Sequence, residues 1–202
     1  MTKSTRKPLS TPRKSSGSFV QRLLSPVVLI SILLVAIVGV IAYAVWQTVD
    51  ATNQASRPIE GLEEYPGQIQ GHVDGLVTYE QTPPVGGTHN AVWQNCGVYT
   101  APVANENAVH SLEHGAIWIT YQPDLAADQV AALQSLTRQS GYRLLSPYPD
   151  LPSPIVASAW GYQLKLEKAD DPRLLSFIQR YEQNPLGPEP GAVCSGGTGQ
   201  PS

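Results

Sequence analysis

The stretch that decides the fold is AIWITY, residues 116–121, together with the segment that follows it. AIWITY is apolar on both alternating faces, which is typical of a strand in the middle of a sheet. PDLAADQVAALQSLTRQSG follows, with apolar residues at helical spacing between a capping Asp124 and a terminating Gly141. The sequence therefore predicts a buried strand followed by an amphipathic helix.

Downstream, the pattern continues with two strands and a second helix. YRLLSPY and PIVASAWGYQLKL read as strands separated by a proline-rich turn. Asp171-Pro172 then opens a helix that ends before Asn184-Pro185. The order strand, helix, strand, strand, helix predicts an α+β domain in which a small sheet carries these two helices on one face.

Near the N-terminus, residues 26–46 form an uncharged apolar run, PVVLISILLVAIVGVIAYAVW. About 20 such residues span a bilayer as a helix, so the run predicts a transmembrane segment. The preceding 25 residues contain six basic and no acidic residues, which predicts a cytoplasmic N-terminus and a domain outside the cell membrane. The alternative is a secretory signal cleaved after Ala44, because Ala42-Tyr43-Ala44 has the small-x-small form.

Charge divides the chain in the same way. After the tail, 7 basic residues remain against all 16 acidic ones, a net charge of −9. An external domain this acidic is a poor nucleic-acid binder, because such binding depends mostly on Lys and Arg. The expected organisation is a disordered basic cytoplasmic tail (1–25), a transmembrane helix (26–46), a linker (47–68), an extracytoplasmic α+β domain (69–185) and a Gly/Pro-rich tail (186–202).

The main functional signal is the clustering of all four histidines between residues 72 and 114. His110 and His114 lie four apart and share one face of either a helix or a strand. Together with His89, in a loop-rich segment, and His72, they suit zinc or copper. Glu113 is a candidate third ligand or a partner that orients an imidazole. The alternative is that these histidines only hydrogen-bond to the backbone of a loop-rich region.

HSLEH, residues 110–114, also fits the H-x-x-E-H pattern of inverted zinc metallopeptidases, with Glu113 as general base. Those enzymes carry the motif within a long helix, whereas Gly115 and a strand follow here. We therefore favour ion binding over catalysis.

The two cysteines, Cys96 and Cys194, both follow the apolar run. In an oxidising compartment a disulfide is the default, and it would tie the C-terminal tail to the histidine-bearing region. Cys96 would then be unavailable as a thiolate ligand.

THNAVWQNCGVY paired with VHSLEHGAIWITY resembles a bacterial family of membrane-anchored proteins known only as a domain of unknown function. The resemblance covers about residues 69–185 and rests chiefly on His89-Asn90, Cys96-Gly97 and residues 110–115. It implies that these residues form one site or structural element, and it implies no activity.

These observations together predict a single-pass membrane protein whose external domain binds zinc or copper through clustered histidines. Its partners are the bilayer and, in a second hypothesis, a membrane protein complex in which it is a non-catalytic accessory subunit. A zinc hydrolase that uses Glu113 is the third hypothesis.

Overall fold

The computed structural model describes residues 26–56 and 58–202, and the expected basic tail, residues 1–25, lies outside the described part. The chain divides into two compact units, residues 1–53 and 54–202, which are described separately. Helix α2, Pro26–Ser56, begins in the first unit, and it continues past the expected end at residue 46. Its segment Pro26–Val49 is long and apolar enough to cross a membrane.

The second unit is built on one mixed sheet, whose six strands among the described residues are ordered β1-β6-β5-β3-β4-β2. The strands are Leu62–Glu64 (β1), Gly97–Val98 (β2), Ile117–Tyr121 (β3), Arg143–Pro147 (β4), Ile155–Ala159 (β5) and Tyr162–Leu166 (β6). β3 pairs parallel with β4 and antiparallel with β5, and all five of its residues are buried. The central position predicted for AIWITY is therefore confirmed.

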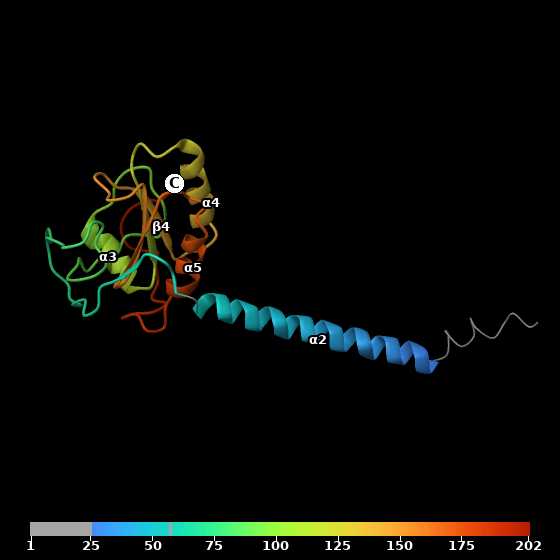
Figure 1. Ribbon diagram of the computed structural model, residues 1–202. Helices are drawn as coiled ribbons and strands as arrows, with labels where there is room; N and C mark the ends of the chain where they lie inside the picture. The colour runs from blue at the N-terminus through green and yellow to red at the C-terminus, as the bar shows by residue number, and fades with distance from the viewer. Residues whose placement is uncertain (1–25, 57) are drawn as a thin grey trace, which may run out of the picture. The chain divides into compact units, whose positions relative to one another are not determined.

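Three helices pack against this sheet within residues 58–202, and the expected α+β class is confirmed. They are α3 (Asn105–Glu113), α4 (Ala127–Thr137) and α5 (Pro172–Tyr181). Figure 1 shows α4 and α5 on one side of β4 and α3 on the other. The two helices predicted from periodicity thus share one face, and α3 alone covers the opposite face.

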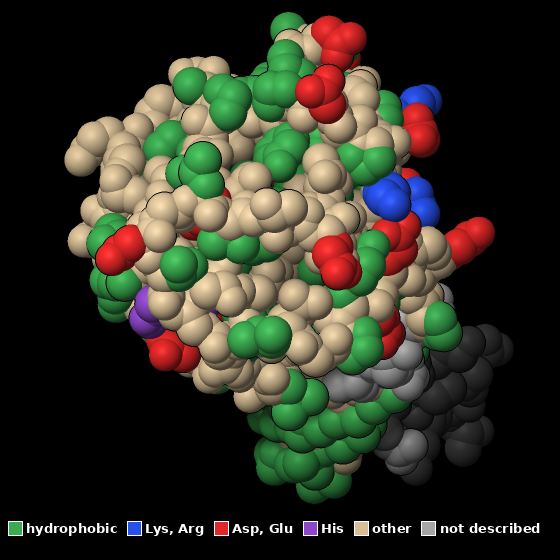
Figure 2. Space-filling view, turned by 90° about the vertical axis from the view of Figure 1, so that its left-hand side faces the viewer, with side chains coloured by type: hydrophobic (Ala, Val, Ile, Leu, Met, Phe, Trp, Pro, Cys, Tyr) green, Lys and Arg blue, Asp and Glu red, His purple; other side chains and the backbone are tan. Residues whose placement is uncertain are grey.

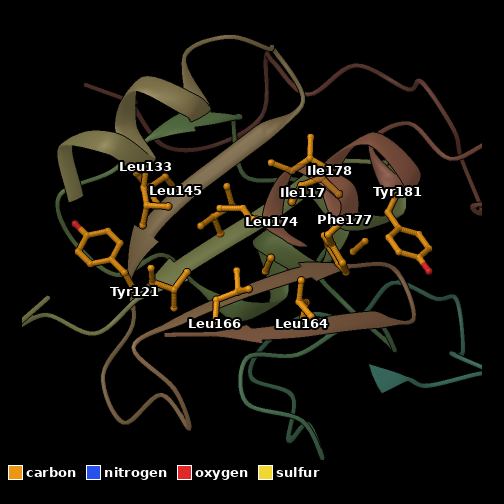
Figure 3. Packing of buried hydrophobic residues seen from close by; sticks show 14 of the residues in the cluster. Ile117, Tyr121, Leu133, Leu145, Leu164, Leu166, Leu174, Phe177, Ile178 and Tyr181 are labelled. Atoms are coloured by element: carbon orange, nitrogen blue, oxygen red, sulfur yellow. The ribbon is translucent and has the colours of Figure 1, made fainter. Parts of the chain in front are cut away.

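The face beneath α4 and α5 holds the larger apolar core. Leu133 of α4 and Phe177 of α5 are fully buried against alternate residues of the central strands, including Ile117 and Leu145 (Figure 3). α5 begins where Asp171 accepts a hydrogen bond from the backbone N–H of Arg173, with Pro172 in its first turn. The period-2 alternation of the strands sends Trp118 and Leu144 to the opposite face, beneath α3.

Two segments outside the predicted elements differ from expectation. Residues 62–64, inside the range expected as a linker, form β1 and pair with β6, while Ile59 is buried in the larger core. HVDGLVTYEQ contains strand-forming residues but contributes no named strand; only an isolated bridge joins His72 to His89. The turn at Asp74-Gly75, where Gly75 has φ +98°, interrupts any longer pairing.

Candidate metal centre

Helix α3 presents the centre's two adjacent polar side chains, His110 and Glu113. They lie three residues apart and so project from one face of the helix. The helix ends immediately afterwards, because Gly115 takes φ +92° and a Cβ there would lie 2.9 Å from the Cα of Gln183. Only glycine fits this close approach, which fixes where the helix stops relative to β3.

The segment around residues 71–95 covers α3 and brings the other two histidines to it. Backbone hydrogen bonds join Val73 to His89 and His89 to Gly71, which set His72 and His89 side by side. The same segment is tied to α3 by Ser111, whose hydroxyl donates to the carbonyl of Gln94. A loop without strands is thereby held in one place over the helix.

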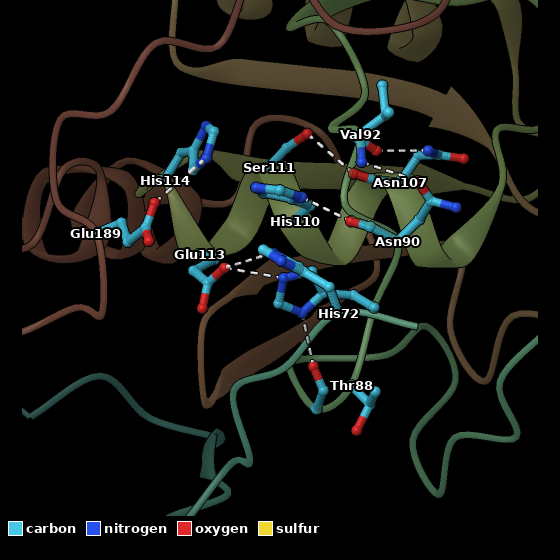
Figure 4. Close-up of polar contacts among 12 residues, drawn as sticks. His72, Thr88, Asn90, Val92, Asn107, His110, Ser111, Glu113, His114 and Glu189 are labelled. Carbon is cyan, nitrogen blue, oxygen red and sulfur yellow. Dashed lines mark hydrogen bonds and ion pairs between the residues drawn. The ribbon is translucent and has the colours of Figure 1, made fainter. Parts of the chain in front are cut away.

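The centre consists of His72, His89, His110 and Glu113, whose ligand atoms all lie within 4.8 Å of one another (Figure 4). Nε2 of His89 is 2.8 Å from Oε2 of Glu113, and Nε2 of His72 is 4.0 Å from the same oxygen. The side chains of His89 and Glu113 are 0% and 4% exposed, whereas that of His72 is 51% exposed. Three of the four side chains, those of His89, His110 and Glu113, are therefore buried, and the centre reaches solvent through His72.

Backbone carbonyls fix the tautomers of the buried imidazoles. Nδ1 of His89 lies 2.8 Å from the carbonyl of Gly87, and Nδ1 of His110 lies 2.6 Å from that of Asn90. A carbonyl can only accept, so each Nδ1 carries the proton and the neutral ring has its lone pair on Nε2. This is the arrangement by which metal-binding histidines are usually oriented.

The contact between His89 and Glu113 is the most informative one in the centre. Nε2 of His89 has no hydrogen-bond partner among the described residues, although the Glu113 carboxylate lies close to it. A lone pair facing a carboxylate oxygen is repulsive, and burial strengthens the repulsion because water cannot screen it. The pair becomes favourable when a cation lies between the two atoms, or when a single proton is shared between the Glu113 carboxyl group and Nε2 of His89.

The sequence around Glu113 contains no Lys or Arg that could neutralise its charge. Residues 58–137 contain no Lys or Arg, although they contain nine acidic residues. Where the structure describes ion pairs of Lys or Arg, their partners are Glu63, Asp171 and Glu182. Burying an ionised carboxylate without a positively charged partner costs free energy. A bound cation would remove this cost at Glu113.

Burial keeps one imidazole of the centre, that of His110, available as a neutral ligand. The pKa of His110 is lowered to about 4, chiefly because burial removes its hydration; the nearby rings of His114, His89 and His72 also lower it, and the bond to Asn90 opposes the shift. His110 is consequently neutral at physiological pH. A neutral imidazole is the form that binds a metal ion.

The donor set fits a tetrahedral zinc ion or a copper ion. Zinc binds imidazole nitrogen and carboxylate oxygen at about 2.0–2.2 Å, which places neighbouring ligand atoms about 3.3 Å apart. The ligand atoms of His89 and Glu113, 2.8 Å apart, must separate by about 0.5 Å to reach this spacing, and the more distant ligand atoms must approach one another by at most about 1.5 Å. Rotation of the exposed His72 side chain can supply such a movement.

His114, expected beside His110 as a ligand, lies next to the centre and is not one of its four members. Its Nδ1 is 2.7 Å from the carbonyl of Val193, and its Nε2 is 3.7 Å from Glu189. The two rings are adjacent, with centroids 4.6 Å apart. In H-x-x-E-H enzymes both histidines hold the metal and the glutamate acts as base, whereas here Glu113 stands among the ligand atoms and His114 points to the tail.

The C-terminal tail forms one wall beside this centre. Cys96 and Cys194 lie at disulfide distance, with 5.4 Å between their Cα atoms. Beyond the disulfide, the backbone of Thr198 bonds to both Trp93 and Asn95. Before it, Glu189 and Gly191 donate to the carbonyls of Glu113 and His114, which closes the C-terminal end of α3. The Gly/Pro-rich tail is therefore attached to the domain along much of its length.

Among the comparisons with known proteins, one family model matches the chain. No curated protein and no solved structure matches the chain. The model of one family matches residues 72–196, more than half of the chain, and this range starts at His72 and includes Glu113 and both cysteines. The chain accordingly belongs to the family described as "Protein of unknown function (DUF3105)".

Proposed function

We propose that the domain binds one zinc or copper ion through His72, His89, His110 and Glu113. The observation that carries this proposal is the 2.8 Å approach of the buried Glu113 carboxyl group to Nε2 of His89, whose Nδ1 faces the carbonyl of Gly87, in a part of the sequence without Lys or Arg. An ion between these atoms converts a repulsion into two coordinate bonds. Nε2 of His110 and the imidazole of His72 complete four ligands, the number zinc prefers in proteins.

The ion would be held outside a cell membrane. The apolar part of α2 supports a single membrane anchor, and the basic residues before it favour a cytoplasmic N-terminus. The cysteine pair at disulfide distance supports an oxidising compartment for the domain. Binding, storage or transfer of the ion fits this arrangement better than turnover, because Glu113 is positioned as a ligand and not as a free base.

The test is metal analysis of the full-length protein, extracted in detergent from an oxidising compartment, stripped and then equilibrated with limiting zinc or copper. We expect about one ion per chain for the unchanged protein. His110→Ala and Glu113→Gln should both lose the ion. Cobalt substitution should give the visible spectrum of a tetrahedral nitrogen and oxygen site.

Glu106→Gln is the matched control for Glu113→Gln. Glu106 lies on the same helix and is also buried, but its carboxylate accepts a hydrogen bond from the backbone of Val77. The Glu106→Gln variant should retain the ion. Unchanged protein that stays folded and metal-free after equilibration with zinc and with copper would overturn the proposal. That outcome would favour the accessory-subunit hypothesis.

A further inference from the structure

Resting on the proposed function, we infer that the ion is an exchangeable cargo that enters and leaves on the His72 side, and that His72 is the ligand that detaches. Under this inference His89, His110 and Glu113 form a fixed part of the centre. The ion would then pass to or from donor groups presented by another molecule at the exposed edge.

Unequal burial is the first reason. The side chain of His72 is 51% exposed, while those of His89, Glu113 and His110 are almost completely buried. The approach to the ion therefore passes His72. In Figure 2, histidine atoms reach the surface beside an acidic side chain, on a face where Lys and Arg appear only along one edge.

Unequal orientation is the second reason. His89 and His110 are each anchored through Nδ1 to a backbone carbonyl, and no described hydrogen bond holds the His72 ring in the same way. Its Nε2 is also 4.0 Å from Glu113, beyond hydrogen-bond distance. The His72 ring is held by ring contacts with His89 and His110 and not by a hydrogen bond, so it rotates away more readily than the two anchored rings do.

The backbone at His72 is nevertheless fixed, which limits the movement to the side chain. The flanking residues Gly71 and Val73 bond to both sides of His89. His72 can therefore swing out and return to the same position without opening the segment that covers α3. A ligand that detaches reversibly at the surface is what transfer to a second molecule requires.

The negative charge of the domain also favours entry of a cation from solvent. With seven basic and sixteen acidic residues after the tail, the domain attracts cations, and an acidic surface raises their local concentration and rate of arrival. The absence of Lys and Arg from residues 58–137 means that no fixed positive charge from that segment opposes an approaching ion.

The experiment measures release of zinc from the loaded full-length protein to a chromophoric chelator by stopped flow. His72→Ala should still bind about one ion but release it at least about tenfold faster, since loss of even a group that only orients a ligand costs about that much in affinity and His72 is proposed to be a ligand itself. His89→Ala should fail to retain the ion. Leu76→Ala, 95% exposed in the same segment, is the matched control and should release zinc at the rate of the unchanged protein.

Two results would overturn the inference without overturning the binding of an ion by the domain, although the second would also remove His72 from the proposed ligands. If His72→Ala loses the ion as completely as His89→Ala, the four ligands are equivalent and the ion is structural. If His72→Ala releases zinc at the unchanged rate, His72 is not a ligand. Unchanged protein that binds no ion would overturn the proposed function together with the inference.

Discussion

The face of the sheet beneath α4 and α5 buries apolar side chains around Phe177, whereas the face beneath α3 buries His89, His110 and Glu113 beside a much smaller apolar cluster. The first face stabilises the fold through burial of apolar surface. The second face sets polar groups under loops and a tail held by hydrogen bonds and the cysteine pair. The same sheet thus combines an apolar side that stabilises the fold with a side whose buried polar groups form the proposed ion site.

Removing the disulfide should produce the largest effect and should act through the α3 side. Cys96→Ser with Cys194→Ser opens a link between residues 98 positions apart, worth about 4–5 kcal/mol in the chain-entropy model. Denaturant unfolding measures this loss. A change below about 1 kcal/mol would mean that the hydrogen bonds of the tail hold it without the disulfide.

Phe177→Ala tests the apolar side. Truncation of this fully buried ring should lower the free energy of unfolding by about 3–5 kcal/mol, while the folded protein keeps its ion. Leu175→Ala, on the exposed side of the same helix, should change stability by less than about 0.5 kcal/mol. Loss of ion binding in folded Phe177→Ala would show that the two faces are not independent.

Zinc itself should stabilise the domain through the α3 side. At about 100 times its dissociation constant the ion should add about 2.7 kcal/mol to the free energy of unfolding. Amide hydrogen exchange should slow most in α3 and the segment around His89. The stabilisation should disappear in Glu113→Gln, and its persistence there would contradict the assignment of Glu113 as a ligand.

Asp171→Ala should have the smallest effect, confined to the start of α5. The hydrogen bonds from Arg173 lower the pKa of Asp171 below its usual 3.8. Because the folded-state pKa is depressed, the stabilisation is fully present above the unfolded pKa and is lost as pH falls through the folded one. The variant should lose about 1 kcal/mol at pH 7 and progressively less below pH 4. An equal loss of stability at pH 7 and below pH 4 would contradict the assignment of a charged Asp171 as the cap of α5.

The sequence predicted the apolar side better than the α3 side, for a physical reason. α4 and α5 follow from spacing within one segment, as at Leu133 and Phe177. At the centre, both Glu113 and His114 lie one turn from His110, so spacing could not distinguish them. The choice depends on long-range partners, since the carbonyl of Val193 engages His114 and leaves Glu113 with His89.

The pairing of His72 with His89 was equally beyond a local pattern. It depends on backbone bonds within a segment that has no strand periodicity. The carbonyls of Gly87 and Asn90, which orient the imidazoles, carry no side-chain signal at all. The histidine cluster was visible in the sequence, but its geometry was not.

The attachment of the C-terminal tail also has a consequence for the order of folding. Thr198 meets Trp93 and Asn95, and Cys194 meets Cys96, across about a hundred residues of chain. Contacts this distant in sequence form late, because the entropy of closing a long loop must be overcome first. During synthesis, the wall beside His114 can therefore assemble only after residues 189–198 have emerged, when the strands and helices that form the apolar core have already been made.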